Sequence, residues 1–368
     1  MSRIENVQAV RGTAILLVLS YHLFGVELKY FSGWRVLPDY LYGGVAGVDL
    51  FFVVSGFIMA TVTRGCFRRP EGIASFVYSR FTRIYPLYWL YSLPLLGLFF
   101  VRPDLVNPSQ GSQVDIVASF LLVPQQRLPL LIVGWTLIHE VYFYAVVTVL
   151  LFAPERYFAG LLLVWAALVV GGHQLAVNPS AFVAYVTNPM TLEFIAGCLV
   201  AIVIGNGLGL SGRAVLASGA VLLFGGWAAY HYGSHQIFPW GWRRIALFGV
   251  PGVLIVSGAV AMEQSAAQLL PRALRSLGDA SYSLYLSHVL VTSALGLAWS
   301  RSGVQGRLYN SLALLVICCA GIAAGVVSHR FLEGPVNEFF RAHRAWVVNR
   351  IVRFAFAGND PSAGSRSS

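Results

Sequence analysis

The sequence predicts an all-α polytopic membrane protein with about ten transmembrane helices and both termini cytoplasmic. Of its 368 residues, 57% are hydrophobic and only 11% are charged, and the mean hydropathy is +0.70. A soluble globular domain carries about 25% charged residues, so fewer than half of the usual charged side chains are present. Apolar runs long enough to cross a hydrocarbon layer of about 30 Å recur along the chain. A cytosolic enzyme, a secreted disulfide scaffold and a disordered protein are therefore excluded.

The apolar runs define the expected spans and domains. The segment 114–123 is apolar but too short to cross, so we expect a re-entrant or interfacial segment there. Residues 1–335 are expected to form the membrane domain, and residues 336–368 a cytoplasmic tail that is partly disordered, because the chain ends in a Gly- and Ser-rich stretch. The ten expected spans are 8–26, 43–63, 84–101, 132–152, 157–173, 189–205, 214–231, 245–263, 282–299 and 309–329.

The orientation follows from the basic residues in the loops. If the N-terminus is inside, one side of the membrane collects 17 Lys and Arg residues and the other keeps 8. The positive-inside rule then places both termini in the cytoplasm. The net charge of +10 is distributed over these loops and forms no basic stripe on a soluble module, so nucleic acid is not an expected partner.

The first span carries two polar residues, Arg11 and His22. Eleven residues at about 100° each place them within ~20° of the same helix face, ~16 Å apart along the axis. Ionisable residues inside a membrane are candidates for function because they are costly to insert. The alternative is that Arg11 is a topology anchor and His22 a core histidine with satisfied hydrogen bonds.

Two carboxylates are expected at a similar depth to His22. Asp49 lies ~9 Å into the second span and Glu140 ~12 Å into the fourth, both measured from the outer side. A histidine partner would lower the cost of a buried carboxylate, either in catalysis or as a structural lock. The pair His139–Glu140 lacks the second histidine of a zinc-binding helix, so no metal is expected.

Two further groups lie near the cytoplasmic ends of spans. Arg80 and Arg83 are three residues apart and share a helix face, where guanidinium groups could bind phosphates or simply lipid headgroups. In the ninth span Tyr282, Tyr285 and His288 form one polar, aromatic strip. Such a strip suits the lining of a tunnel for an amide- and hydroxyl-bearing chain, or hydrogen bonding between helices.

Taken together, these segments resemble the acyltransferase-3 family of integral-membrane O-acyltransferases, and in particular its branch that acetylates bacterial exopolysaccharide such as succinoglycan. The matching pieces occur in the family's order over about residues 5–335. They are Arg11-(ten residues)-His22, Gly-Val-Asp49-Leu-Phe-Phe, Arg80-Phe-Thr-Arg83, Trp135-Thr-Leu-Ile-His-Glu140, Gly278-Asp-Ala-Ser-Tyr-Ser-Leu-Tyr285-Leu-Ser-His288 and Phe331-Leu-Glu333-Gly-Pro335.

The resemblance implies a separate role for each of these residues. His22 would be the catalytic base, Glu140 its partner, and Arg11 would help to hold the donor or the oxyanion. Arg80 and Arg83 would engage the phosphates of acetyl-CoA. Three further residues match motif positions. Asp49 would belong to the catalytic residues, and Tyr285 and His288 would help to bind the donor. A base that removes the acceptor's proton fits this chemistry, although an acetyl-histidine intermediate is equally compatible.

The sequence thus predicts an acetyl-CoA-dependent O-acetyltransferase of the bacterial inner membrane. Its acceptor would be a hydroxyl of a surface polysaccharide, either lipid-linked or free, and membrane lipids and polysaccharide-assembly proteins are expected partners. The alternatives are transfer of succinyl or a longer acyl group, a glycan or anion transporter, and a non-enzymatic scaffold for export. The lack of a repeat of fixed period argues against the transporter.

Overall fold

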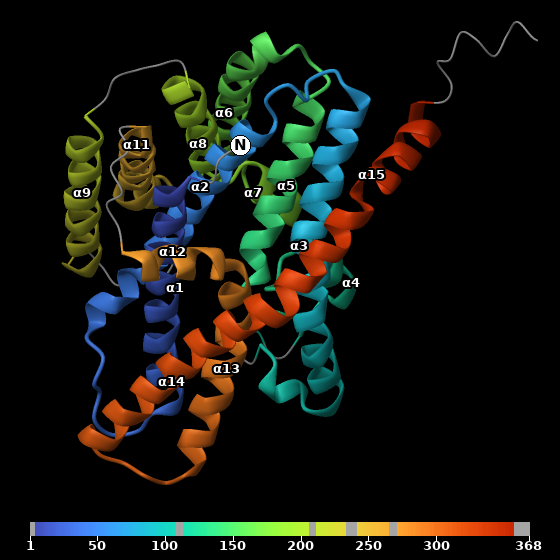
Figure 1. Cartoon of the computed structure of the whole chain (residues 1–368). Coiled ribbons are helices and arrows are strands. Elements are labelled where there is room, and N and C mark those ends of the chain that lie inside the picture. Colours follow the sequence, from blue (N-terminus) through green and yellow to red (C-terminus); the bar gives the residue numbers. More distant parts are fainter. Residues whose placement is uncertain are drawn as a thin grey trace, which may run out of the picture.

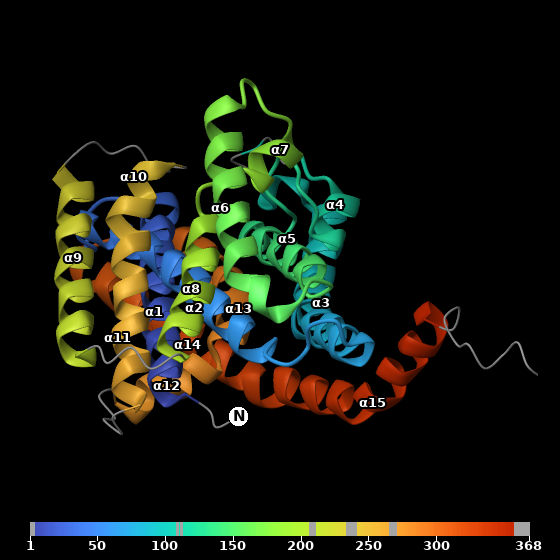
Figure 2. The same cartoon turned by 90° about the horizontal axis from the view of Figure 1, so that it is seen from above.

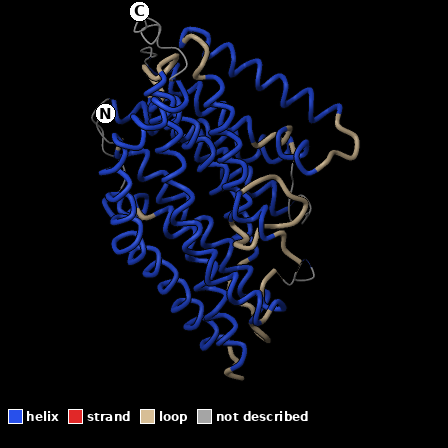
Figure 3. The backbone as a smooth tube through the Cα atoms, turned by 90° about the vertical axis from the view of Figure 1, so that its right-hand side faces the viewer, coloured by secondary structure: helices blue, strands red, loops and turns tan. Residues whose placement is uncertain are grey.

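The computed structural model describes residues 4–107, 110, 113–205, 211–232, 241–264 and 271–356, and over these it contains helices and no strand (Figure 3). The elements are α1 (Glu5–Tyr30), η1 (Asp39–Val45), α2 (Ala46–Val62), α3 (Pro70–Val101), η2 (Pro103–Leu105), α4 (Ile116–Leu121), α5 (Gly134–Leu150), η4 (Glu155–Tyr157), α6 (Phe158–Leu175), α7 (Ala181–Val186), α8 (Thr191–Gly205), α9 (Gly212–Tyr232), α10 (Trp242–Arg244), η5 (Ile245–Gly249), α11 (Val250–Gln264), α12 (Arg272–Asp279), α13 (Ser281–Arg301), α14 (Arg307–Ser328), η6 (His329–Glu333) and α15 (Gly334–Phe356).

Each of the ten expected spans coincides with one of these helices. Within the described residues, eight helices are long and apolar enough to cross a membrane. The expected spans that fall outside this group are α5, which is apolar but has 17 residues, and α13, which carries the polar strip. The multi-pass helical class is confirmed, while the orientation of the termini stays a prediction. The segment expected to be re-entrant or interfacial contains the six-residue helix α4.

Helix α1 lies at the centre of the bundle. It contacts α2, α11, α12, α13, α14 and η1, while α9 and α11 lie on one side of it and α3, α4 and α5 on the other (Figures 1 and 2). Its first amides are capped by another helix, because Glu263 of α11 accepts hydrogen bonds from Glu5 N (3.0 Å) and Asn6 N (2.8 Å). A carboxylate is favoured at this position by the partial positive charge of a helix N-terminus.

Glycines allow the central helices to approach closely. A Cβ on Gly56 of α2 would lie 1.9 Å from the Phe194 carbonyl oxygen of α8, and one on Gly197 would lie 2.0 Å from the Val53 oxygen. Likewise a Cβ on Gly278 of α12 would lie 1.8 Å from the Gln8 oxygen of α1. Small residues are the usual means by which membrane helices bring their backbones together.

The short helix α4 is held by aromatic residues of α3. The last carbonyls of a helix have no partner within it. Here the Tyr88 hydroxyl donates to Ser119 O (2.8 Å), Trp89 Nε1 to Phe120 O (2.9 Å) and the Tyr85 hydroxyl to Leu121 O (2.9 Å). These bonds fix α4 and the connection that follows it, residues 122–133, against the bundle.

The expected tail begins as a helix. Helix α14 continues through the π-helical segment η6 into α15, which extends past α3 and away from the body of the molecule (Figures 1 and 2). The Tyr78 hydroxyl of α3 donates to the Phe340 carbonyl (2.9 Å), and Arg344 donates to Ser75 through Nε (2.9 Å). Residues 357–368, where disorder is expected, lie outside the described residues.

Candidate functional site

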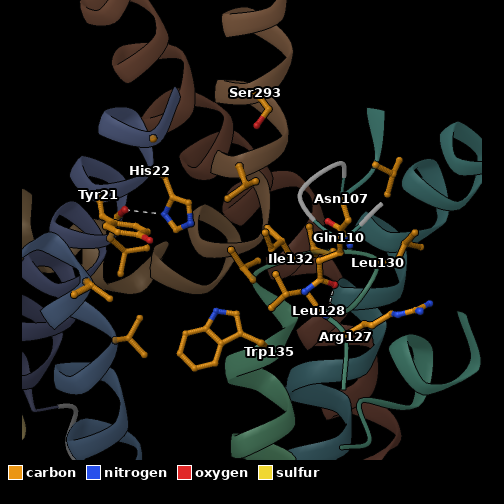
Figure 4. Close-up of a pocket in the computed structure, with 18 of the residues that line it drawn as sticks. Tyr21, His22, Asn107, Gln110, Arg127, Leu128, Leu130, Ile132, Trp135 and Ser293 are labelled. Carbon is orange, nitrogen blue, oxygen red and sulfur yellow. Dashed lines mark hydrogen bonds between the residues drawn. The ribbon is translucent and has the colours of Figure 1, made fainter. Parts of the chain in front are cut away.

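Two cavities lie one beyond the other along α1. The arginine cavity, of about 570 Å³, is lined by Arg11, Arg80 and Arg83 and lies beside the first half of α1. The histidine cavity, of about 1550 Å³, is lined by His22 and His139 and lies beside the second half (Figure 4). Arg11 and His22, predicted to share a helix face, therefore open into different cavities.

In the histidine cavity, the hydrogen-bond partner of His22 is His288. Its Nε2 lies 3.2 Å from His22 Nδ1, and the two rings meet edge to face with centroids 4.7 Å apart. His288 is fully buried and is not among the residues that line either cavity. His288 therefore contacts His22 without lining a tunnel wall, and its expected role in donor binding stays a prediction.

The backbone carbonyls determine which nitrogen of His22 is free. His288 Nδ1 lies 2.8 Å from the Leu284 carbonyl oxygen, which only accepts, so this nitrogen carries the proton and His288 Nε2 is an acceptor. His22 Nδ1 lies 2.9 Å from the Val18 oxygen and next to His288 Nε2, so it donates. The Nε2 of His22 is then unprotonated, as a general base requires.

In the arginine cavity, Arg11 is held by two side-chain hydrogen bonds, whereas Arg80 has only weak contacts, with Ser79 Oγ (3.4 Å) and Met59 Sδ (3.9 Å). Arg11 donates to Gln8 Oε1 (3.0 Å) and to Ser281 Oγ (2.8 Å). Arg80 lies near the rings of Phe76 and Tyr144, with its guanidinium carbon 5.9 Å and 5.7 Å from their centroids, and within the described part of the chain it forms no ion pair. Arg80 is therefore a cation available to an anion that enters this cavity.

Arg83, by contrast, is paired with Glu333. Arg83 Nη1 lies 2.6 Å from Glu333 Oε1, and the guanidinium stacks 4.9 Å from the centroid of the Tyr282 ring. The other oxygen of Glu333 accepts from Ser283 Oγ (2.7 Å) and lies 2.9 Å from His329 Nδ1. The two arginines that were expected to bind phosphate therefore differ. Arg80 is outside any described ion pair, whereas Arg83 holds η6 against α3 and α13 through Glu333.

Glu140 is not the partner of His22. Its carboxylate accepts a short hydrogen bond from the Tyr144 hydroxyl and lies 3.5 Å from Ser55 Oγ, and it lines the arginine cavity. The expected pairing is wrong because similar depth in the membrane does not fix the direction in which side chains on different helices point. Glu140 is instead grouped with Arg11 and Arg80.

Asp49 forms a buried ion pair that the sequence did not reveal. Arg244 donates to both of its oxygens, through Nε (2.9 Å) and Nη2 (2.8 Å), and both side chains are at most 1% exposed. Asp49 is not among the lining residues of either cavity, so its expected catalytic role does not fit its position. Arg244, expected in a loop, is the last residue of α10, directly before the π-helical segment η5, and its ion pair ties this region to α2.

A wall separates the two cavities, and Val48 and Tyr285 line both. The Tyr285 hydroxyl donates to the Val133 carbonyl oxygen (3.0 Å) and lies 2.6 Å from Thr136 Oγ1. The expected donor-side residue Tyr285 is therefore placed where the cavities meet. Among the described residues, no group of three His, Cys, Asp or Glu side chains is arranged to hold a metal ion.

A helical membrane protein with a histidine in one cavity and arginines in the next defines a class of candidates, and comparison with known proteins identifies the family. The acyltransferase-3 family, described as an acyltransferase domain, matches residues 4–330, and the chain belongs to it. The protein is therefore an acyltransferase that transfers groups other than amino-acyl groups.

Two characterised proteins are similar. The exopolysaccharide production protein ExoZ of Rhizobium meliloti is 32% identical over 82% of this chain and 92% of its own length. The peptidoglycan O-acetyltransferase OatA of Listeria monocytogenes is 25% identical over 38% of this chain and 19% of its own. No solved structure matches the chain significantly.

Proposed function

We propose that this protein is an inner-membrane O-acetyltransferase that moves the acetyl group of cytoplasmic acetyl-CoA to a hydroxyl of a surface polysaccharide. The observation that carries the proposal is the free Nε2 of His22 in a large cavity, separated by a thin wall from a smaller cavity with an available cation. The names of ExoZ and OatA support a glycan acceptor and an acetyl group respectively.

The donor would enter the arginine cavity. Charge-assisted hydrogen bonds from a guanidinium are well suited to phosphate, so Arg80 would hold a phosphate group of the CoA. Arg11, fixed by Gln8 and Ser281, would lie further along the path. The thioester would then reach the wall at Tyr285, close to the cavity that contains His22.

The acceptor would enter the histidine cavity. His22 Nε2 takes the proton of the acceptor hydroxyl as its oxygen bonds to the thioester carbonyl carbon. The C–S bond then breaks, and the departing CoA thiolate takes the proton back from the imidazolium. His288 helps to keep the Nδ1 proton of His22 in place throughout, so the base is correctly oriented.

The experiment compares the mass of the surface-polysaccharide repeat unit from cells that make the wild-type chain or His22→Ala at equal membrane abundance. The matched control is His343→Ala, which changes an exposed histidine of α15. Loss of an acetyl increment with His22→Ala alone supports the proposal. Loss of a different acyl increment overturns acetyl as the donor group, and an unchanged spectrum overturns the acceptor class or the role of His22.

A further inference from the structure

One buried polar side chain in the histidine cavity, Gln125, has no hydrogen-bond partner in the part of the chain that the structure describes. Gln125 lies on the connection after α4, is 9% exposed, and lines this cavity. Within the described residues, neither its Oε1 nor its Nε2 is hydrogen-bonded. Burying an amide without a partner is costly, so the position requires an explanation other than folding stability.

The connection that carries Gln125 is firmly held. Leu128 N donates to Gln110 Oε1 (2.8 Å) and Leu130 N to Ser119 Oγ (3.0 Å). Asn107 Nδ2 donates to the Pro129 carbonyl oxygen (2.9 Å). Neighbouring polar side chains thus bind the backbone of this connection, whereas Gln125 is left with a donor and an acceptor in a fixed position. Figure 4 shows Gln110 and Leu128 on the far side of the cavity from His22.

The chemistry of the cavity indicates what would bind there. It is larger than the 300–1,000 Å³ that is typical for a small-molecule site, which leaves room for more than one sugar unit. Its polar lining includes the amides of Asn107, Gln125 and Gln126, and no Asp or Glu belongs to the described lining. An amide that both donates and accepts matches the hydroxyl and acetamido groups of a sugar.

Resting on the proposed function, we propose that Gln125 is the hydrogen-bonding subsite that recognises a hydroxyl or acetamido group of the acceptor glycan. Its side chain binds a sugar group at the opposite side of the cavity from His22, so it orients the reacting hydroxyl toward the base. Gln125 is a specificity-determining residue, and it takes no part in donor binding.

The test is Gln125→Leu, an apolar change of similar size. The probe is the base-deacylated repeat-unit oligosaccharide of the host's surface polysaccharide, measured for direct binding to the purified protein without acetyl-CoA and for transfer with it. We expect binding to weaken and the acceptor KM to rise by about 5- to 140-fold, which corresponds to one hydrogen bond lost to a buried polar group. The KM for acetyl-CoA and the thermal stability stay unchanged, or stability rises, because the variant removes an unpaired buried amide.

The control is Gln305→Leu, the same change at an exposed amide outside the cavity. Binding and acceptor KM that do not change in Gln125→Leu would overturn the proposal, and so would a fall in thermal stability, which would reveal a structural partner. A wild-type protein that does not bind the oligosaccharide also overturns it. A wild-type protein that binds the oligosaccharide but transfers no acetyl refutes the proposed function alone, because the binding arm still decides the role of Gln125.

Discussion

At the scale of single residues, the chain of contacts from Leu284 to His22 explains why two histidines are needed. A neutral imidazole has one donor and one acceptor nitrogen, and its tautomer is set by the partner of the other nitrogen. The Leu284 carbonyl fixes His288, and His288 together with Val18 fixes His22. In the proposed mechanism, His288 is therefore a positioning residue that acts through His22.

Replacing His288 separates this role from simple packing. His288→Leu is expected to lower kcat by about 10- to 100-fold, because His22 loses an acceptor that favours the correct tautomer. His288→Gln should recover part of the rate, since its amide oxygen can accept from His22 Nδ1. The check is kcat and the KM for acetyl-CoA at matched membrane abundance. Equal losses in both variants, accompanied by a loss of folded protein, would show that the histidine only packs.

The arginines Arg80 and Arg83 of α3 should respond differently to substitution. Arg80→Met is expected to raise the KM for acetyl-CoA by about 10- to 100-fold with normal folding, because one charge-assisted hydrogen bond to a phosphate is lost. Arg83→Met should instead reduce membrane abundance, because it leaves the buried Glu333 carboxylate without its cation. Initial rates over a range of acetyl-CoA concentrations, together with immunoblots of membranes, distinguish them. The structural role of Arg83 would be contradicted if Arg83→Met folds normally and only its affinity for acetyl-CoA falls.

In the buried ion pair Asp49–Arg244, we expect substitution of the arginine to reduce stability more than substitution of the aspartate. Glu193 is also buried and interacts electrostatically with both partners. Arg244→Met leaves the buried Asp49 carboxylate, next to Glu193, without its cation and is expected to cost about 3–5 kcal/mol of stability. Asp49→Asn leaves Arg244 near Glu193 and should cost less. Thermal unfolding of the two variants in detergent measures the order, and the reverse order would contradict this account.

At the scale of elements, the sequence was most informative about the apolar segments that cross the membrane. The ten apolar runs became helices because a backbone in hydrocarbon has to form its own hydrogen bonds. Residues 70–83 and 336–356 are helical beyond the apolar runs, because α3 and α15 pack against each other. Hydropathy does not report such tertiary contacts, so it cannot predict these helical extensions. For the same reason the pairs Arg83–Glu333 and Asp49–Arg244 were not predictable, although all but Arg244 were recognised as motif residues.

Helices α12 and α1 pack so closely that one added methyl group should force them apart. Gly278→Ala would place a Cβ 1.8 Å from the Gln8 oxygen, so the helices must separate at an expected cost of about 1–3 kcal/mol. Gly160→Ala in α6 is the control, because nothing lies within 4 Å of its Cβ. That variant should be stabilised by about 0.5–1 kcal/mol through helix propensity. Thermal unfolding compares them, and equal effects would show that α12 adapts freely.

At the scale of the whole molecule, the arrangement of the cavities would set the direction of the proposed reaction. Helices α1, α2, α3, α5 and α13 line both cavities, and Val48 and Tyr285 belong to the boundary. Along α1 and α13, the first turns contribute to the arginine cavity, whereas the later turns contribute to the histidine cavity. A donor and an acceptor that enter these cavities would therefore approach from opposite faces of the bundle.

This geometry predicts transfer across the membrane, which sealed vesicles can test. In inside-out vesicles the face of the N-terminus is outward, if the termini are cytoplasmic as the basic loops predict. Labelled acetyl-CoA added outside should acetylate a deacylated oligosaccharide trapped inside. Acetyl-CoA trapped inside with the oligosaccharide outside should give little product, since neither charged donor nor polar glycan crosses the bilayer. Detergent should restore both arrangements to the same rate. If the two sealed arrangements are equally active, both substrates reach His22 from one face, and the wall at Tyr285 is not the boundary between donor and acceptor.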